Sequence, residues 1–151
     1  MVDPKTPFSA CVVAGCILVA VIVVAVSGNP VEEPNSIDLD DVFRAIRQVE
    51  TGGHPSPATA VGDGGRSLGP MQIQKPYFLD AVEHDSSLAG LEYEQVKDVE
   101  VAKRVMRAYW DRYAPGPWSA ETLCRLHNGG PSKRGTDQYW EKCRRILTDG
   151  G

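Results

Sequence analysis

The chain has 151 residues and a formal net charge of −4, which is enough length for one modest domain. Asp3 and Lys5, the charged residues among the first 28, cancel each other, so the rest of the chain carries the whole negative charge. This acidic balance argues against non-specific nucleic-acid binding, and also against long-range attraction to anionic cell surfaces.

The first predicted element is an apolar segment at residues 8–26 that contains no charged side chain. A helix of this length just spans a bilayer core of ~30 Å, at a rise of ~1.5 Å per residue. A polar stretch with Pro30 follows it. We therefore expect a signal peptide or signal anchor at residues 1–28, a linker at residues 29–36, and one soluble domain at residues 37–151.

Three interpretations of the apolar segment remain open. An uncleaved transmembrane anchor fits its length, because the apolar cores of signal peptides are usually shorter. A cleaved signal peptide is the second, with a weak cleavage site at residues 25–27. The third is a lipid-modified Cys16 behind a lipobox-like sequence, although the apolar run continues past this cysteine. Each interpretation predicts an extracytoplasmic domain, anchored at the membrane in the periplasm or at the cell surface, or secreted.

The four cysteines do not form a disulfide scaffold. Cys11 and Cys16 fall in the apolar segment, which leaves Cys124 and Cys143 in the domain. These two either form a single bridge or are two buried thiols on helix faces.

The domain is predicted to be α+β: mostly helical, with one small β-hairpin, and preceded by the N-terminal hydrophobic helix. Asp38 caps a first helix that Gly52 stops. The glycine-rich residues 61–68 then predict a small hairpin. Further helices are predicted at residues 76–82, 93–113 and 119–126, and from Thr136 onward.

Glu50 is the informative residue of the first helix. It follows Phe43 and Ile46 by seven and four positions, so it projects from the apolar stripe of that helix. Burial and the negative end of the helix dipole are both expected to raise the pKa of the Glu50 carboxyl. A general acid for glycoside cleavage needs a protonated carboxyl. The alternative is a glutamate at a frayed helix end whose carboxyl points to solvent.

Asp63 lies thirteen residues further on, in the glycine-rich loop. A solvated aspartate there stays ionised, and one protonated and one ionised carboxyl form the usual pair of a glycosidase. The alternative is an Asp-Gly turn residue with no further role.

Several motifs together resemble the lysozyme superfamily. Around Glu50 and Asp63, these are Val49-Glu50-Thr51-Gly52, Gly62-Asp63 and Ser67-Leu68-Gly69-Pro70-Met71-Gln72-Ile73. Later in the chain come Leu126-His127-Asn128-Gly129-Gly130-Pro131, Gly135-Thr136 and Tyr139-Trp140. The later block resembles the invertebrate-type lysozymes, the family that includes destabilase, and the resemblance spans roughly residues 42–143.

This resemblance implies a lysozyme-like α+β fold and hydrolysis of β-1,4 bonds in peptidoglycan. It also implies that Glu50 is the acid and Asp63 the second carboxylate, with a small change of loop length before Gly69. The residues that it implies near the substrate are Ser67, Gln72, Tyr77, His127 and Asn128. For His127 the alternative is a helix-end histidine that bonds local backbone.

The chain also departs from the family. The family is rich in disulfides, and some members cleave isopeptide bonds with a serine and a lysine. Here Gln74 stands at the lysine position and Lys75 follows it, so we do not carry that activity over. The sequence contains no metal-ligand motif, phosphate loop or nucleophile elbow, and we expect no cofactor and no metal.

Three functions follow as hypotheses. The first is a monomeric muramidase acting on peptidoglycan or a related aminosugar polymer such as chitin, with no nucleic-acid partner. The second is a lytic transglycosylase, which needs Glu50 alone. The third is a non-catalytic glycan-binding domain, against which the presence of both Glu50 and Asp63 argues.

Overall fold

The computed structural model describes residues 37–52, 54, 59–62 and 64–149, all within one unit that spans Asn35–Gly151. The predicted anchor or signal segment, its linker and Asp63 lie outside the described residues. No helix of the described residues is long and apolar enough to cross a membrane. The anchor, the cleaved signal and the lipid-modified Cys16 therefore stay predictions.

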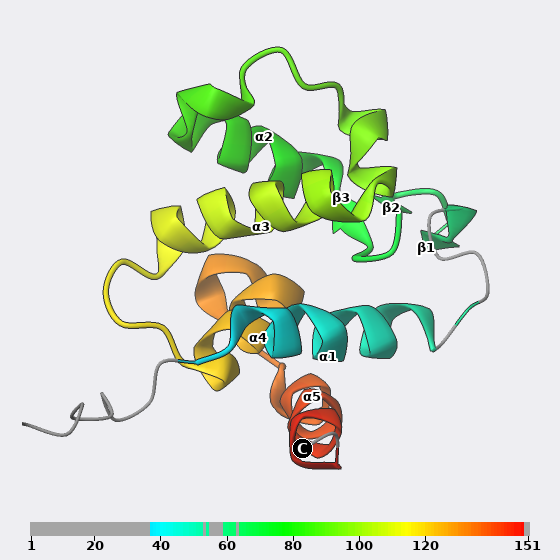
Figure 1. The fold of residues 1–151 in the computed structure, drawn as a ribbon, viewed down its shortest axis with the longest axis vertical. Helices are drawn as coiled ribbons and strands as arrows, with labels where there is room; N and C mark the ends of the chain where they lie inside the picture. Colours follow the sequence, from blue (N-terminus) through cyan, green and yellow to red (C-terminus); the bar gives the residue numbers. More distant parts are fainter. Residues whose placement is uncertain (1–36, 53, 55–58, 63, 150–151) are drawn as a thin grey trace, which may run out of the picture. The chain divides into compact units, whose positions relative to one another are not determined.

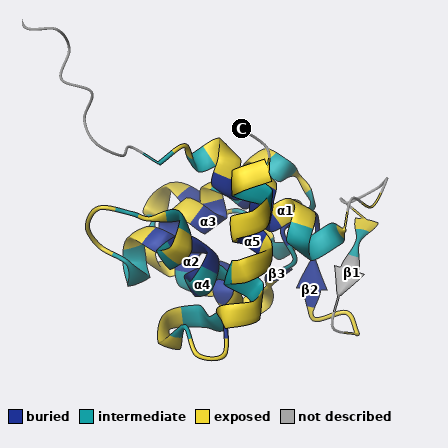
Figure 2. Cartoon of the chain, turned by 90° about the horizontal axis from the view of Figure 1, so that it is seen from below, coloured by how far each residue is buried: buried dark blue, intermediate teal, exposed yellow. Residues whose placement is uncertain are grey.

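The fold is mostly helical. Its helices, together with three short 3-10 helices in the described part of the chain, surround a common apolar core, and Figure 2 shows the buried residues on the faces that the helices turn toward one another. Helix α2 packs along α3, and α5 packs against α1 and α4 (Figure 1). The α-helices are α1 Leu39–Thr51, α2 Lys75–His84, α3 Val99–Tyr113, α4 Ala120–Gly129 and α5 Asp137–Asp149. The 3-10 segments with several described residues are η2 Ser86–Leu88, η3 Tyr93–Lys97 and η4 Gly130–Ser132.

Helix α1 forms where the sequence predicts it. The Asp38 carboxylate accepts a hydrogen bond from the Asp40 backbone N–H at 2.8 Å, and Gly52 ends the helix in the left-handed conformation with φ 56°. Phe43 and Ile46 are buried, and the Phe43 ring stacks on Trp110 with centroids 5.1 Å apart. The buried face holds α1 in the core, and with it the last turn, which carries Glu50.

The predicted hairpin is confirmed but belongs to a larger sheet. Strands β1 Val61–Gly62, β2 Ser67–Leu68 and β3 Ile73–Gln74 form an antiparallel sheet in that order. In the register, Val61 pairs with Leu68, and Leu68 pairs with Ile73. The third strand was not predicted, because a two-residue strand is too short to produce the alternating pattern that identifies strands in a sequence.

Gly69 makes the turn between β2 and β3 possible. Its φ is 75°, and a Cβ at this position would lie 2.5 Å from the Val96 carbonyl oxygen. A glycine is therefore required for two reasons, backbone conformation and close approach to η3. This close packing holds the loop with Ser67 and Gln72 against the helical part of the domain.

The prediction of one continuous helix over residues 93–113 is wrong. The 3-10 helix η3 ends at Lys97, Asp98 is extended with φ −77° and ψ 133°, and α3 begins at Val99. The Asp98 carboxylate accepts hydrogen bonds from the backbone N–H groups of Glu100 and Val101. Asp98 thus acts as an N-cap inside a run whose apolar spacing alone looks continuous.

The other predicted helices are confirmed. Pro76 lies in the first turn of α2, and Ser119 caps α4 by accepting from the Thr122 N–H at 3.1 Å. Cys124 on α4 and Cys143 on α5 are buried and free, so of the two alternatives the structure shows buried thiols. The contact with Cys143, and then burial, raise the pKa of the Cys124 thiol.

Candidate active site

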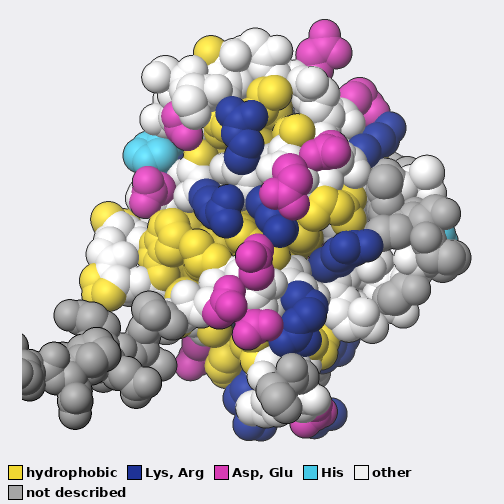
Figure 3. All heavy atoms as spheres, viewed as in Figure 1, with side chains coloured by type: hydrophobic (Ala, Val, Ile, Leu, Met, Phe, Trp, Pro, Cys, Tyr) yellow, Lys and Arg dark blue, Asp and Glu magenta, His cyan; other side chains and the backbone are white. Residues whose placement is uncertain are grey.

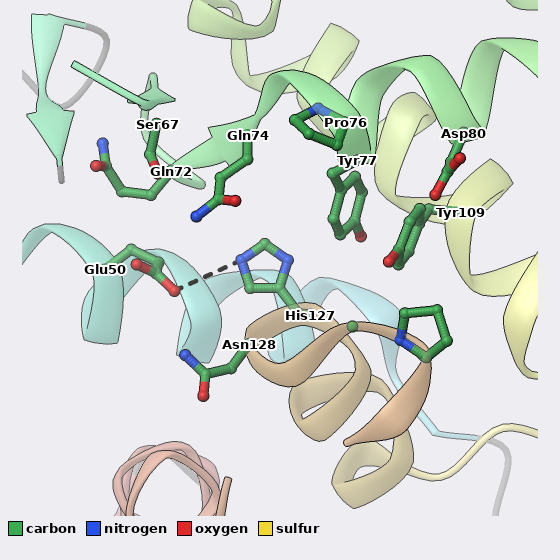
Figure 4. Close-up of a pocket in the computed structure, with 12 residues that line it drawn as sticks. Glu50, Ser67, Gln72, Gln74, Pro76, Tyr77, Asp80, Tyr109, His127 and Asn128 are labelled. Atoms are coloured by element: carbon green, nitrogen blue, oxygen red, sulfur yellow. Dashed lines mark ion pairs between the residues drawn. The ribbon is translucent and has the colours of Figure 1, made fainter. Parts of the chain in front are cut away.

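One cleft, of about 340 Å³, collects the predicted site residues that the structure describes. Helices α1, α2, α3 and α4 and the small sheet all contribute to its walls (Figure 4). From the predicted set, its lining contains Glu50, Ser67, Gln72, Tyr77, His127 and Asn128. Residues that the sequence did not single out for the site also line it: Gln74, Pro76, Asp80, Tyr109, Gly130 and Pro131. Side chains far apart in the sequence thus meet around one space.

Glu50 lies in the last turn of α1, with its side chain 19 % exposed. The Tyr139 hydroxyl, from α5, donates a hydrogen bond of 2.7 Å to Glu50 Oε1. Burial, and then the charge of Glu50 and this hydrogen bond, raise the pKa of Tyr139. Tyr139 therefore stays protonated and is a fixed donor to one oxygen of the carboxyl, which does not swing freely into solvent.

His127 approaches the same oxygen from α4. Its Nε2 lies 3.5 Å from Glu50 Oε1, and its side chain is only 3 % exposed. The ring meets the Tyr77 ring edge-on, with centroids 5.6 Å apart. Its other nitrogen, Nδ1, is buried and has no hydrogen-bond partner among the described residues. Leaving such a group unpaired costs ~1–3 kcal/mol. His127 therefore contacts the carboxyl across the cleft, which is not the behaviour of a helix-end histidine that bonds local backbone.

Ser67 and Gln72 belong to the sheet side of the cleft. Ser67 is buried in β2. Gln72 has a left-handed backbone with φ 47°, and its side-chain Nε2 donates to the carbonyl oxygens of Ala60 at 3.2 Å and Gly69 at 2.8 Å. The amide nitrogen of Gln72 thus stabilises the loop that forms this wall by hydrogen bonds to its backbone.

Asp80 lies at the end of the cleft away from Glu50, with Tyr77 and His127 between them (Figure 4). The Tyr113 hydroxyl donates to Asp80 Oδ2 at 2.9 Å. Arg112 donates to the Asp80 backbone oxygen at 2.9 Å and to the Glu83 carboxylate at 2.7 Å. The Asp80 carboxylate is therefore oriented by a neutral donor, while the nearby guanidinium is shared with Glu83.

The tyrosines of α2 and α3 form the wall between these two ends. The rings of Tyr77 and Tyr109 stack with centroids 3.5 Å apart. Burial, and then the neighbouring Tyr113 and Asp80, raise the pKa of Tyr109 to about 12. The Tyr77 hydroxyl oxygen itself is buried, although the residue lines the cleft.

The sequence contains a pattern that could have identified Asp80, but none that identifies the role of Tyr139. Asp80 follows Tyr77 by three positions on α2, which places both on one helix face. In the sequence, Tyr139 stands out only as part of the Tyr139-Trp140 motif. No periodicity within a helix identifies a partner 89 residues away, so its bond to Glu50 needed the structure.

The described residues contain no group of three or more His, Cys, Asp or Glu side chains that could hold a metal ion. Within this part of the chain, the chemistry that the cleft offers is that of two carboxyls, an imidazole and neutral hydrogen-bonding groups.

The sequence matches no protein-family model and no curated protein. The structure is similar to the crystal structure of Tapes japonica lysozyme, with 24 % identity and a TM-score of 0.55 over 70 % of this chain and 85 % of that one. It is also similar to a chain in the crystal structure of Aeromonas hydrophila PliI in complex with Meretrix lusoria lysozyme. There the identity is 25 % and the TM-score 0.58, over 70 % and 88 % of the two chains. The resemblance to invertebrate-type lysozymes is therefore confirmed at the level of the fold.

Proposed function

We propose that this chain is a lysozyme-type glycosidase that cleaves β-1,4 bonds of peptidoglycan with Glu50 as general acid. The observation that carries the proposal is the half-buried Glu50 carboxyl in the wall of the cleft, with Tyr139 bound to Oε1, in a lysozyme-like fold. Glu50 gives its proton to the glycosidic oxygen as the bond from that oxygen to the anomeric carbon breaks. The leaving sugar then departs as a neutral alcohol.

Asp63 is proposed as the second carboxylate, as nucleophile or as ion-pair stabiliser of the positive charge on the sugar. Because retaining glycosidases hold the two carboxyls ~5–5.5 Å apart and inverting ones ~6.5–9.5 Å apart, the anomer formed first reports on its role. The family resemblance favours retention. NMR of the first-formed product, together with an Asp63→Asn variant that binds glycan but turns over slowly, would support Asp63. An inverted product would assign it another role.

The cleft offers groups suited to an aminosugar polymer. Its described lining contains amides, hydroxyls and two carboxyls, but no lysine or arginine. Sugar hydroxyl and acetamido groups pair with such neutral donors and acceptors. Asn128 has an exposed side chain at the cleft, and the oriented Asp80 carboxylate accepts hydrogen bonds from hydroxyls at the far end. We propose that these two residues bind the chain on either side of the cleaved bond.

We further propose that the domain acts outside the cytoplasm as a monomer. The location outside the cytoplasm rests on the uncharged segment at residues 8–26, which is typical of a signal peptide or an anchor.

The decisive experiment is product analysis with the full chain and purified peptidoglycan, with a parallel incubation on chitin. We expect soluble fragments with new reducing ends, and none with Glu50→Gln. Anhydro ends in place of reducing ends would indicate a lytic transglycosylase. Pelleting with the glycan without release of fragments would indicate a glycan-binding domain and would overturn the proposal.

A further inference from the structure

Three buried polar atoms behind the cleft wall lack a hydrogen-bond partner among the described residues. They are Tyr77 Oη, Trp110 Nε1 and His127 Nδ1, from α2, α3 and α4 respectively. The Tyr77 and His127 rings are in edge-on contact at 5.6 Å. In Figure 4, Tyr77 lies on the side of the His127 ring that faces away from Glu50, and its hydroxyl points toward α4. Tyr77, which carries one of these unpaired atoms, therefore adjoins the histidine that contacts the proposed acid.

The chemistry of these groups restricts how they can pair. An indole N–H only donates, a carboxylate only accepts, and a hydroxyl does both. A neutral histidine donates through one ring nitrogen and accepts through the other. Since His127 Nε2 faces the carboxylate oxygen Glu50 Oε1 at 3.5 Å, Nε2 has to carry the proton and Nδ1 has to accept.

The remaining assignment follows from the same rule. Trp110 can satisfy its N–H only at an acceptor, and the Tyr77 oxygen is an unpaired acceptor on which the indole acts. Tyr77 then has its own proton left to donate, and Nδ1 of His127 is the atom that needs one. A doubly protonated His127 would leave the Tyr77 proton with no acceptor among these groups.

We infer that Trp110, Tyr77 and His127 form a hydrogen-bond relay that ends on Glu50. Its order is Trp110 Nε1–H to Tyr77 Oη, Tyr77 O–H to His127 Nδ1, and His127 Nε2–H to Glu50 Oε1. Its first two links are not formed in this structure, so the relay requires side-chain rotations that close them. The catalytic meaning of this relay rests on the proposed function, whereas the relay itself does not.

The surroundings of Tyr77 agree with a donating hydroxyl. Burial, and then Tyr109, raise the pKa of Tyr77 well above its usual value, so the hydroxyl keeps its proton. The Trp110 indole acts in the opposite direction and lowers this pKa. Both atoms are buried, and no hydrogen bond is formed between them in this structure.

The relay changes the role of Tyr77 from a substrate contact to a positioning residue. Its hydroxyl oxygen is buried and acts on Glu50 through His127. With Tyr139 and His127 both directed at Oε1, the other oxygen, Oε2, is the one that carries the proton for the leaving group. A carboxyl held in this way presents its proton in one orientation.

The test is the tautomer of His127, measured by two-bond 1H–15N correlation NMR on the 15N-labelled full chain without substrate. The signal is assigned by its loss in His127→Gln, since the chain has three histidines. We expect a neutral ring with the proton on Nε2. In Tyr77→Phe we expect a mixture of tautomers and a kcat about three- to tenfold lower with KM unchanged, the range that one hydrogen bond is worth.

Tyr93→Phe is the matched control, because the Tyr93 hydroxyl donates to the Ile73 carbonyl oxygen at 2.7 Å and does not face His127. It should leave the His127 tautomer as in the parent. A proton on Nδ1 in the parent would overturn the relay, even if Tyr77→Phe failed to fold. A changed tautomer with an unchanged kcat would overturn the positioning role. If the parent cleaved no glycan, the proposed function would fail, while the tautomer would still decide the relay.

Discussion

Two of the hollows that helix α1 borders have their charged side chains arranged in opposite ways. The smaller hollow, of about 190 Å³, is lined by residues of α1 and α3 and by Met71. In it, Lys103 pairs with Asp40 at 3.1 Å and with Glu100 at 3.2 Å, and the Lys103 ammonium lies 5.5 Å from the centre of the Phe43 ring. Figure 3 shows basic and acidic side chains mixed on the face of the molecule in that view. The charge of Lys103 is therefore neutralised by neighbouring carboxylates.

In the cleft at the other end of α1, the Glu50 carboxyl has no basic side chain as its neighbour in the described lining. Glu50 receives a hydrogen bond from neutral Tyr139 and lies near His127, and no lysine or arginine belongs to the described lining. A carboxyl oriented by neutral groups keeps its capacity for proton transfer, whereas a carboxylate bound to an ammonium loses most of it. We therefore interpret the cleft as a site for chemistry and the smaller hollow as a surface that holds two helices together. Matched substitutions in the two hollows test this interpretation.

The largest difference is expected between Glu50→Gln and Glu100→Gln. Both replace a glutamate by its amide, but Glu50→Gln removes the proposed acid and should lower turnover by ~10²–10⁴-fold. Glu100 is exposed on α3 beside Lys103, and its replacement should leave turnover as in the parent. The measurement is the clearing of a peptidoglycan suspension, with circular dichroism to check folding. Equal turnover for the two variants would remove Glu50 from the mechanism.

Tyr139→Phe tests whether the neutral donor matters. It deletes the 2.7 Å hydrogen bond to Glu50 Oε1 without changing the ring. Hydrogen bonds to charged groups are worth ~1.5–3 kcal/mol, so kcat should fall by about ten- to a hundredfold, with a smaller change in KM. Tyr93→Phe, which loses a hydrogen bond to backbone in the same domain, should lower thermal stability but not kcat. If both variants lost kcat equally, the effect would come from stability alone.

Asp80→Asn should have a smaller effect. Asp80 lies at the far end of the cleft from Glu50, so the substitution should weaken glycan binding and leave the chemical step intact. We expect KM to rise by about three- to tenfold, corresponding to one hydrogen bond to a sugar hydroxyl, with kcat close to the parent. Initial rates over a series of soluble glycan fragments separate the two parameters. A loss of kcat instead would place Asp80 in the chemical step.

The two ends of the cleft also differ in how far the sequence predicts them. Glu50 was found from its position on an apolar stripe and from the motif around it, and His127 and Asn128 from their motif. The Tyr139 contact was not predicted, because it depends on how α5 packs against α1. Asp80 was not predicted, because the hydrogen bond that orients its carboxylate comes from Tyr113 on a neighbouring helix. Local patterns predict α1 and its two ends, whereas pairs between helices depend on packing.

The smallest effect is expected for an ion pair beside the smaller hollow. Arg44 pairs with Asp41 at 2.9 Å, with the two side chains 44 % and 53 % exposed. Because solvent screens such a pair, a double-mutant cycle of Arg44→Ala and Asp41→Ala should give a coupling of ~0.2–1 kcal/mol in the free energy of unfolding. The coupling should weaken further at high salt. Turnover should not change in any of the three variants, because neither side chain lines the cleft.

Denaturant unfolding at two salt concentrations gives the coupling, and peptidoglycan clearing gives the turnover. A loss of turnover in Arg44→Ala without a loss of stability would mean that the two hollows communicate through α1, and the separation between them would no longer hold.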